Sequence, residues 1–148
     1  MFTIVSYTSA GPIRFGMSQD ELKDVIGPPI RMGKNFIGNA TWTYRDFDVQ
    51  LSAVDDIVIQ AGFTPQVGVD LDGIDIFRLP SAFEDLIKKD GQPFESNGFI
   101  ILLRLGITLT GFHDNDPSQK AVTAFARGVW DDSRARFKPY VMGSRPSP

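Results

Sequence analysis

The chain has 148 residues, of which 42% are hydrophobic and 22% are charged, as in a single globular domain that buries roughly two thirds of its unfolded surface. Its net charge of −3 argues against a nucleic-acid-binding protein, because such proteins carry a basic patch that neutralises phosphates. Cysteine is absent, which excludes disulfides, thiolate metal sites, a cysteine nucleophile and a lipid-anchored cysteine.

The N-terminal sequence MFTIVSYTSAGPIRFG has neither a basic start nor a long apolar run, so we predict no signal peptide. No stretch approaches the roughly 20 apolar residues that span a bilayer. We therefore expect a cytoplasmic protein of bacterial type that does not enter a membrane.

The first predicted elements are a strand over residues 2–7 and a short amphipathic helix that begins after Ser18. Ser18 and Glu21 have the spacing of a capping box, in which each side chain accepts a hydrogen bond from the other residue's backbone N–H group. Gly27 and the two prolines that follow predict the end of the helix. The apolar residues of the helix form one stripe: Leu22, Val25 and Ile26.

After the helix we predict a glycine-rich loop over residues 32–40 and then three strands. The first strand carries Trp42 and Tyr44. The next two, over residues 47–53 and 57–63, alternate apolar and polar residues, which is typical of strands that are buried on one face only.

The same order of elements recurs later in the chain. Ser81 and Glu84 again have the spacing of a capping box before an apolar stripe, and alternating residues follow over 99–112 and 120–130. We therefore predict one domain, residues 1–140, made of two helix–strand–strand–strand repeats. The first repeat is expected at residues 12–64 and the second at residues 74–130. The linker between them covers residues 64–75, and a flexible tail covers residues 141–148.

These elements predict the α+β class, with an antiparallel sheet of six or more strands and two helices on one face. The opposite face of the sheet would stay open. An antiparallel sheet can expose one face to solvent, so an open polar face by itself does not establish a binding surface.

The run FGMSQDELKDVIGPP, followed by a W-x-Y strand and two alternating strands, resembles the repeat of the beta-lactamase-inhibitor-protein superfamily. Small outer-membrane assembly lipoproteins share a related single unit. The resemblance covers residues 15–63 well and residues 77–129 in pattern only, and the chain lacks the cysteines and export signals common in that superfamily. It implies an inhibitor or immunity-type protein that binds another protein, such as a toxin or an enzyme, through the open sheet face.

The candidate partner-binding residues are the polar alternate positions of the strands, together with two aromatic residues that are either an exposed patch or the rim of the core. We expect at least one of the two aromatic residues to be in the core. The candidates are Asp48, Gln50, Ser52, Gln60, Arg104, Thr108, Thr110, Thr123, Trp42 and Tyr44.

The alternative function is that of an enzyme or a small-ligand-binding protein with a pocket near Trp42, Tyr44 and His113. His113 is the only histidine, and Asp114 or Asp116 could orient it as a catalytic base. No G-x-S-x-G nucleophile elbow is present. A turn rich in Asp, Asn, Pro and Ser is also what turn chemistry alone would select.

No cofactor or metal site is expected. Asp70, Asp72 and Asp75 lie near Gly73 as in a calcium loop, but Ser81 stands at the twelfth position, where an EF-hand needs a glutamate. The glycine-rich loop lacks the G-K-[ST] ending of a phosphate-binding loop. The sequence leaves the identity of the partner and the oligomeric state open.

Overall fold

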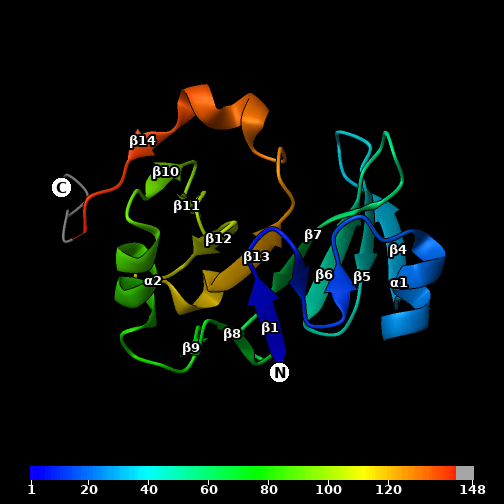
Figure 1. The fold of residues 1–148 in the computed structure, drawn as a ribbon, viewed down its shortest axis with the longest axis horizontal. Helices are drawn as coiled ribbons and strands as arrows, with labels where there is room; N and C mark the ends of the chain where they lie inside the picture. The colour runs from blue at the N-terminus through cyan, green and yellow to red at the C-terminus, as the bar shows by residue number, and fades with distance from the viewer. Residues whose placement is uncertain (143–148) are drawn as a thin grey trace.

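The computed structural model describes residues 1–142 and has an α+β fold (Figure 1). Two α-helices accompany a nine-stranded and a five-stranded sheet. The expected class and the large antiparallel sheet are thus confirmed. Residues 143–148, which make up most of the predicted tail 141–148, lie outside the described residues.

The nine-stranded sheet is antiparallel throughout, with the order β14-β10-β11-β12-β13-β7-β6-β5-β4. Strands β7 and β13 pair at its centre, with Gly62 opposite Thr123. The strands are β4 (Arg31–Lys34), β5 (Ala40–Thr43), β6 (Phe47–Leu51), β7 (Val58–Phe63), β10 (Phe94–Ser96), β11 (Phe99–Leu102), β12 (Ile107–Thr110), β13 (Ala121–Phe125) and β14 (Lys138–Pro139).

Each helix is followed by more than the three expected strands of the large sheet: β4–β7 follow α1, and β10–β14 follow α2. Strand β4 lies where a glycine-rich loop was expected, and β10 precedes residues 99–112, which were expected to supply the first two strands of the second repeat. Residues 99–112 contain two strands, β11 and β12, joined by a turn at residues 103–106. The alternation correctly located β6, β7 and β13, whose apolar residues face one side of the sheet.

The solvated linker expected at residues 64–75 instead contains two strands, β8 and β9, of the five-stranded sheet. The order of this sheet is β3-β2-β1-β8-β9, and β1 runs parallel to β8. Asp72 and Gly73 adopt positive φ angles of 49° and 83° in the β8–β9 turn, as a two-residue hairpin requires. The strands are β1 (Phe2–Val5), β2 (Ser9–Ala10), β3 (Ile13–Arg14), β8 (Val69–Leu71) and β9 (Ile74–Asp75).

Helix α1 (Gln19–Ile26) begins with the predicted capping box. The Ser18 hydroxyl accepts from the Glu21 N–H group at 3.2 Å, and the Glu21 carboxylate accepts from the Ser18 N–H group at 3.1 Å. Helix α2 (Ala82–Asp90) lacks this arrangement, because the Ser81 hydroxyl donates to Asp85 at 2.9 Å instead. The second predicted capping box is therefore wrong. No helix within residues 1–142 is long and apolar enough to cross a membrane.

Both helices contribute to one hydrophobic core beneath one face of the large sheet. Leu22 of α1 and Leu86 of α2 are fully buried in the same cluster as alternate strand residues such as Val49, Ala61 and Val122. The helices lie near opposite ends of the sheet, α1 beside β4 and α2 near β10–β12 (Figure 1). The intervening strand residues point to the opposite face.

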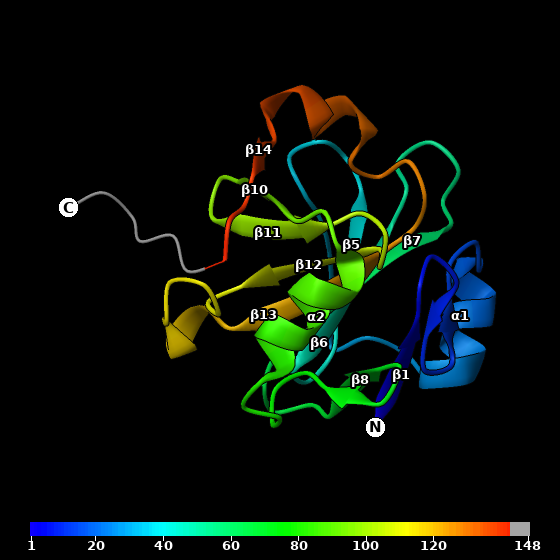
Figure 2. The ribbon, with the colours of Figure 1, turned by 60° about the vertical axis from the view of Figure 1, so that its left-hand side comes forward.

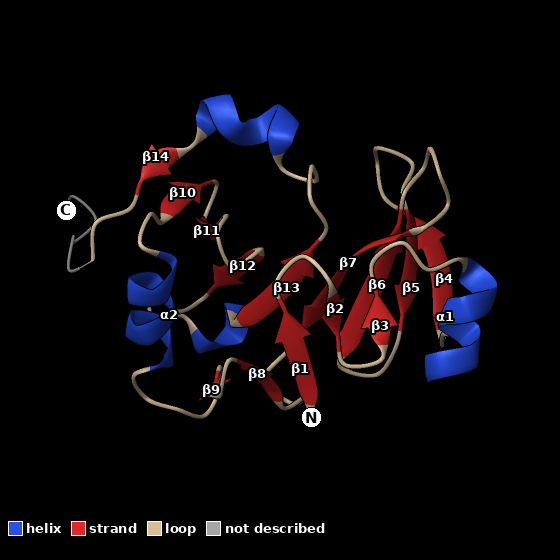
Figure 3. Ribbon diagram, viewed as in Figure 1, coloured by secondary structure: helices blue, strands red, loops and turns tan. Residues whose placement is uncertain are grey.

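The C-terminal segment, residues 126–140, covers part of that opposite face. It includes the 3-10 helix η2 (Asp131–Arg136), which lies beyond β10 and β11 in both Figures 2 and 3. Trp130 packs on Phe99 with ring centroids 5.8 Å apart, and Phe137 packs on Phe94 at 5.7 Å. This segment leaves the face open mainly over β4–β7 and β13, so the open area is smaller than expected.

Candidate functional site

The uncovered part of the large sheet carries a continuous set of polar residues, which we call the open face. One cross-strand row runs from β5 to β13 through directly paired residues, and a parallel row lies two residues along the strands. All of these residues are partly exposed. The first row is Thr43, Asp48, Gly62 and Thr123, and the second is Thr41, Gln50 and Gln60.

A depression of about 330 Å³ lies on the open face around Gly62. Gly62 lines this depression, and a side chain at this position would fill it. A Cβ atom at this position would lie 3.0 Å from Oδ1 of Asp48 and 3.2 Å from Oγ1 of Thr123. The glycine therefore lets the two polar side chains converge over the sheet.

The Asp48 carboxyl is the titratable group of this depression. Burial raises its pKa, and a hydrogen bond from the backbone N–H group of Gly62 partly opposes that effect. Desolvation of a carboxylate is unfavourable unless hydrogen bonds or an opposite charge compensate for it. A ligand that donates hydrogen bonds or carries positive charge would therefore be favoured in this depression.

The structure brings four of the predicted partner-binding residues onto the open face: Asp48, Gln50, Gln60 and Thr123. Gln50 and Gln60 are directly paired across β6 and β7, and the Asn35 amide donates to Gln50 at 3.2 Å. These four residues lie on the strand face that the alternation predicted for them.

Three other predicted residues are hydrogen-bonded within the chain or buried. Ser52 lies in the β6–β7 turn, where its hydroxyl accepts from the Val54 N–H group at 3.2 Å. The Thr110 hydroxyl donates to the Gln119 carbonyl at 2.7 Å. Thr108 is only 3% exposed, so it is not available to a partner. The alternation could not show that another segment of the chain covers this position.

Arg104, Trp42 and Tyr44 do not lie on the open face, and the expectation that at least one of the two aromatic residues is in the core is confirmed. Arg104 lies in the β11–β12 turn and not on a strand. Trp42 is fully buried, and the buried Tyr44 donates its hydroxyl hydrogen bond to the Gly27 carbonyl at 2.8 Å. Both aromatic residues are in the core because their strand alternation points them toward the helices.

His113 does not share a pocket with Trp42 and Tyr44. It follows β12 and lies 6.0 Å from Tyr140, measured between ring centroids. Strands β13, β7 and β6 separate β12 from β5, a distance of about 19 Å at the usual strand spacing. The pocket expected from these three residues is therefore not assembled.

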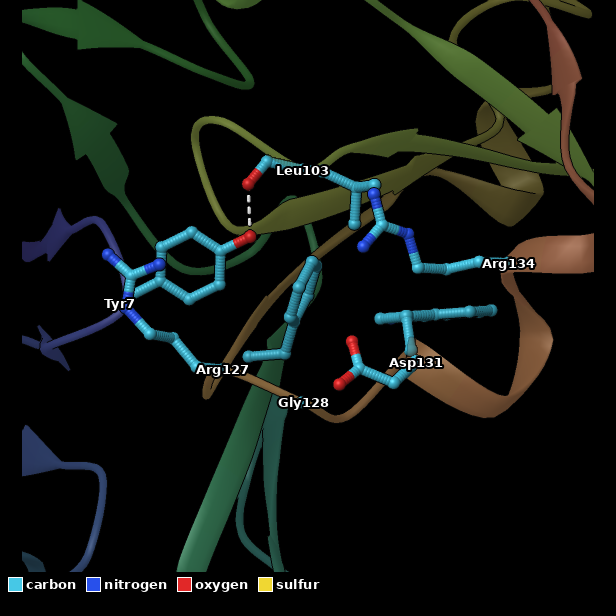
Figure 4. Close-up of a pocket in the computed structure, with 8 residues that line it drawn as sticks. Tyr7, Leu103, Arg127, Gly128, Asp131 and Arg134 are labelled. Carbon is cyan, nitrogen blue, oxygen red and sulfur yellow. Dashed lines mark hydrogen bonds between the residues drawn. The ribbon is translucent and has the colours of Figure 1, made fainter.

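A different pocket, of about 300 Å³, lies between the β1–β2 loop and the C-terminal segment (Figure 4). The Tyr7 hydroxyl donates to the Leu103 carbonyl, and the Arg127 guanidinium lies 4.3 Å from the centroid of the Tyr7 ring. Burial raises the pKa of Tyr7, and the Arg127 charge opposes this. Arg134 also lines the pocket. Neither arginine forms a salt bridge within residues 1–142. No sequence motif marked this site.

Asp90, at the end of α2, is a buried acid that sequence analysis did not single out. Its carboxylate accepts from the N–H groups of Arg104 at 2.9 Å, Leu105 at 3.1 Å and Gln92 at 3.2 Å. It therefore holds the β11–β12 turn against the helix. This role is structural, and no local pattern reveals it because the turn lies far along the chain.

The three aspartates of the linker are not gathered around a common centre. Asp70 accepts from the Thr3 hydroxyl at 2.7 Å, and Asp72 pairs with Lys89 at 3.0 Å. Within residues 1–142 no group of three or more histidines and acids is placed to hold a metal ion. Comparisons with protein-family models, curated proteins and solved structures give no significant match.

Proposed function

We propose that the chain is a non-enzymatic protein-binding module of the inhibitor or immunity type, which engages another protein, such as a toxin or an enzyme, through the open face. The observation that carries this proposal is the depression at Gly62, where Asp48 and Thr123 converge on an uncovered part of the sheet. A face that only meets solvent gains nothing from a desolvated carboxylate.

The C-terminal segment covers only part of the outer sheet face, and this supports the same function. The C-terminal segment buries apolar residues such as Ile101 on the outer face of β11, whereas the polar rows over β5–β7 and β13 stay accessible. Protein interfaces combine a buried centre with a polar, partly hydrated surround. Asp48 would serve as the centre, and Gln50 and Gln60 as part of the surround.

We also infer that the fold is a tandem repeat, in which α1 with β4–β7 corresponds to α2 with β10–β13. In support, Trp42 and Ile100 are buried core residues on the second strand of each unit, and Val49 and Ile107 are buried on the third. The last strands of the two units, β7 and β13, pair at the centre of the sheet. We also propose a cytoplasmic location.

A second candidate function is binding of a small anionic ligand in the pocket of Figure 4. It is favoured by Arg127 and Arg134, whose guanidinium groups have no carboxylate partner within residues 1–142. If this were the function, millimolar phosphate or a small carboxylate would raise the melting temperature of the wild type but not of an Arg127→Ala, Arg134→Ala double variant.

The test of the proposed function is site-specific photocrosslinking in the cells that encode the protein. A photoreactive amino acid at Gln60 is expected to capture a defined protein, and the matched probe at the exposed Lys88 of α2 is not. The captured protein is then purified, and its affinity is measured with wild type, Asp48→Lys and Lys88→Glu. Asp48→Lys should weaken binding by about 2–5 kcal/mol if Asp48 is central. Equal affinity of all three proteins would contradict the proposal.

A further inference from the structure

We infer that the free edge of β4 is a docking strand for an extended acidic segment of a partner protein, which would add a further strand to the nine-stranded sheet. The inference rests on the proposed function, because β4 continues the rows of the open face and its occupant would belong to the same partner. Arg31 of β4 pairs with Thr43, the first residue of the row that contains Asp48.

Within residues 1–142 no strand pairs with the outer edge of β4, and this edge is accessible. β4 ends the strand order, and all four of its residues are exposed. A Cβ atom built on Gly33 would meet nothing within 4 Å. In Figure 1, β4 is the last strand at the right of the large sheet. The face of the sheet at Gly33 is therefore uncovered.

The backbone of β4 can form a second ladder. The Asn35 N–H group donates to the Asn39 carbonyl at 2.9 Å, which fixes this pair as hydrogen-bonded. Since hydrogen-bonded pairs alternate along an antiparallel ladder, the polar backbone groups of Met32 and Lys34 point away from β5. Free edges are usually protected by proline, a bulge, extreme shortness or charged side chains. The opposite edge, β14, has two residues and ends in Pro139, whereas β4 has four residues, contains no proline and carries the charges of Arg31 and Lys34.

Apolar side chains accompany these free backbone groups. Met32 pairs with the buried Trp42 and so lies on the core side of the sheet, yet it is 57% exposed. Ile30 is 75% exposed and Phe36 is 100% exposed. Clustered exposed apolar residues mark protein-interaction sites, and strand addition uses such side chains for specificity.

The charge of β4 selects an acidic occupant over a second copy of the chain. Arg31 and Lys34 are its only charged residues, and both are positive although the chain has a net charge of −3. A two-fold antiparallel pairing through the outward groups of Met32 and Lys34 would gather the Arg31 and Lys34 side chains of both copies on one pair of neighbouring strands, where like charges repel. An acidic segment with alternating apolar residues would place its acids on the face of Arg31 and its apolar side chains on the opposite face, beside Met32.

The probe is a fluorescent octapeptide that alternates glutamate and valine, titrated with the purified protein and followed by anisotropy. We expect saturable binding to wild type. Binding should weaken at least about tenfold with Met32→Pro, which removes an outward N–H group, and with the Arg31→Glu, Lys34→Glu pair. The matched control is Val54→Pro, at an exposed turn residue outside β4. Unchanged melting temperatures would show that the variants are folded.

Three results would overturn the inference. One is the absence of saturable peptide binding to wild type, and another is equal binding to wild type and folded Met32→Pro. The third is a wild-type dimer in sedimentation that Met32→Pro converts to monomer, since the edge would then hold a second copy. A lysine–valine octapeptide that binds as tightly as the acidic one would exclude the charge selection.

The same titration separates this inference from the proposed function. Asp48→Lys and Gln60→Lys alter the open face but not the edge, so the acidic peptide should bind these variants within about twofold of wild type. If both proposals hold, these variants should lose binding of the partner identified by crosslinking but should still bind the acidic peptide. Retained partner binding would overturn the open-face function alone, and loss of peptide binding would overturn the edge assignment.

Discussion

Gly62 lies directly opposite Asp48 on neighbouring strands, and a Cβ atom at Gly62 would approach Oδ1 of Asp48 to 3.0 Å. Gly62→Val should therefore fill the depression and displace the carboxylate. We expect weaker binding of the captured partner, while the free energy of unfolding changes by less than about 1 kcal/mol, because the strand preference of valine offsets the crowding. Affinity measurement and urea denaturation check this, with Lys88→Ala as the control at an exposed residue of α2.

Asp48 should also make stability depend on pH. Its pKa is raised above the unfolded value of 3.8 because burial disfavours the charged form. The folded state then holds the proton to higher pH than the unfolded state, so stability falls as pH rises from 3.8 through the folded pKa. Asp48→Asn should be more stable than wild type at pH 7, by up to about 1 kcal/mol. The difference should disappear below pH 3.8. A constant difference across that range would contradict the assignment.

The two helix starts provide a matched pair of variants. Ser18→Ala removes a formed capping box and should lower the free energy of unfolding by about 1 kcal/mol. Ser81→Ala removes only an exposed hydroxyl contact with Asp85 and should cost less than about 0.5 kcal/mol. Urea denaturation at constant pH measures both. Equal losses would mean that Ser81 caps α2 in solution.

The sequence signals that succeeded were local. Alternation located β6, β7 and β13 because each buries only one face, and residues 18–27 contain both ends of α1. The same helix-start spacing failed at Ser81, where the hydroxyl bonds to Asp85 and does not cap the helix. Spacing alone does not specify the backbone geometry that a cap requires.

The features that were missed depend on distant parts of the chain. Gly33 made residues 32–40 look like a loop, although pairing with β5 makes β4 a strand. Alternation predicted that Thr108 points away from the helices but not that this position is buried. The candidate site was therefore predicted at Asp48, Gln50, Gln60 and Thr123, whereas Gly62 carried no signal until the strands were paired.

Asp90 connects α2 to the β11–β12 turn, and its removal should be the most destabilising of these changes. Its buried carboxylate accepts three backbone N–H groups, those of Gln92, Arg104 and Leu105. Asp90→Ala leaves these N–H groups without their acceptor. Each N–H group that water cannot reach then destabilises the folded state by the free energy of the lost hydrogen bond. We expect a loss of about 2–4 kcal/mol in the free energy of unfolding.

The control for Asp90→Ala is Glu84→Ala, which removes a carboxylate from the same helix but breaks only the exposed pair with Lys88. That change should cost less than about 0.5 kcal/mol. Hydrogen exchange adds a local readout, because the amides of Arg104 and Leu105 should lose protection in Asp90→Ala before those of β6 and β7 do. If the two variants unfold at the same urea concentration, the carboxylate does not hold the turn.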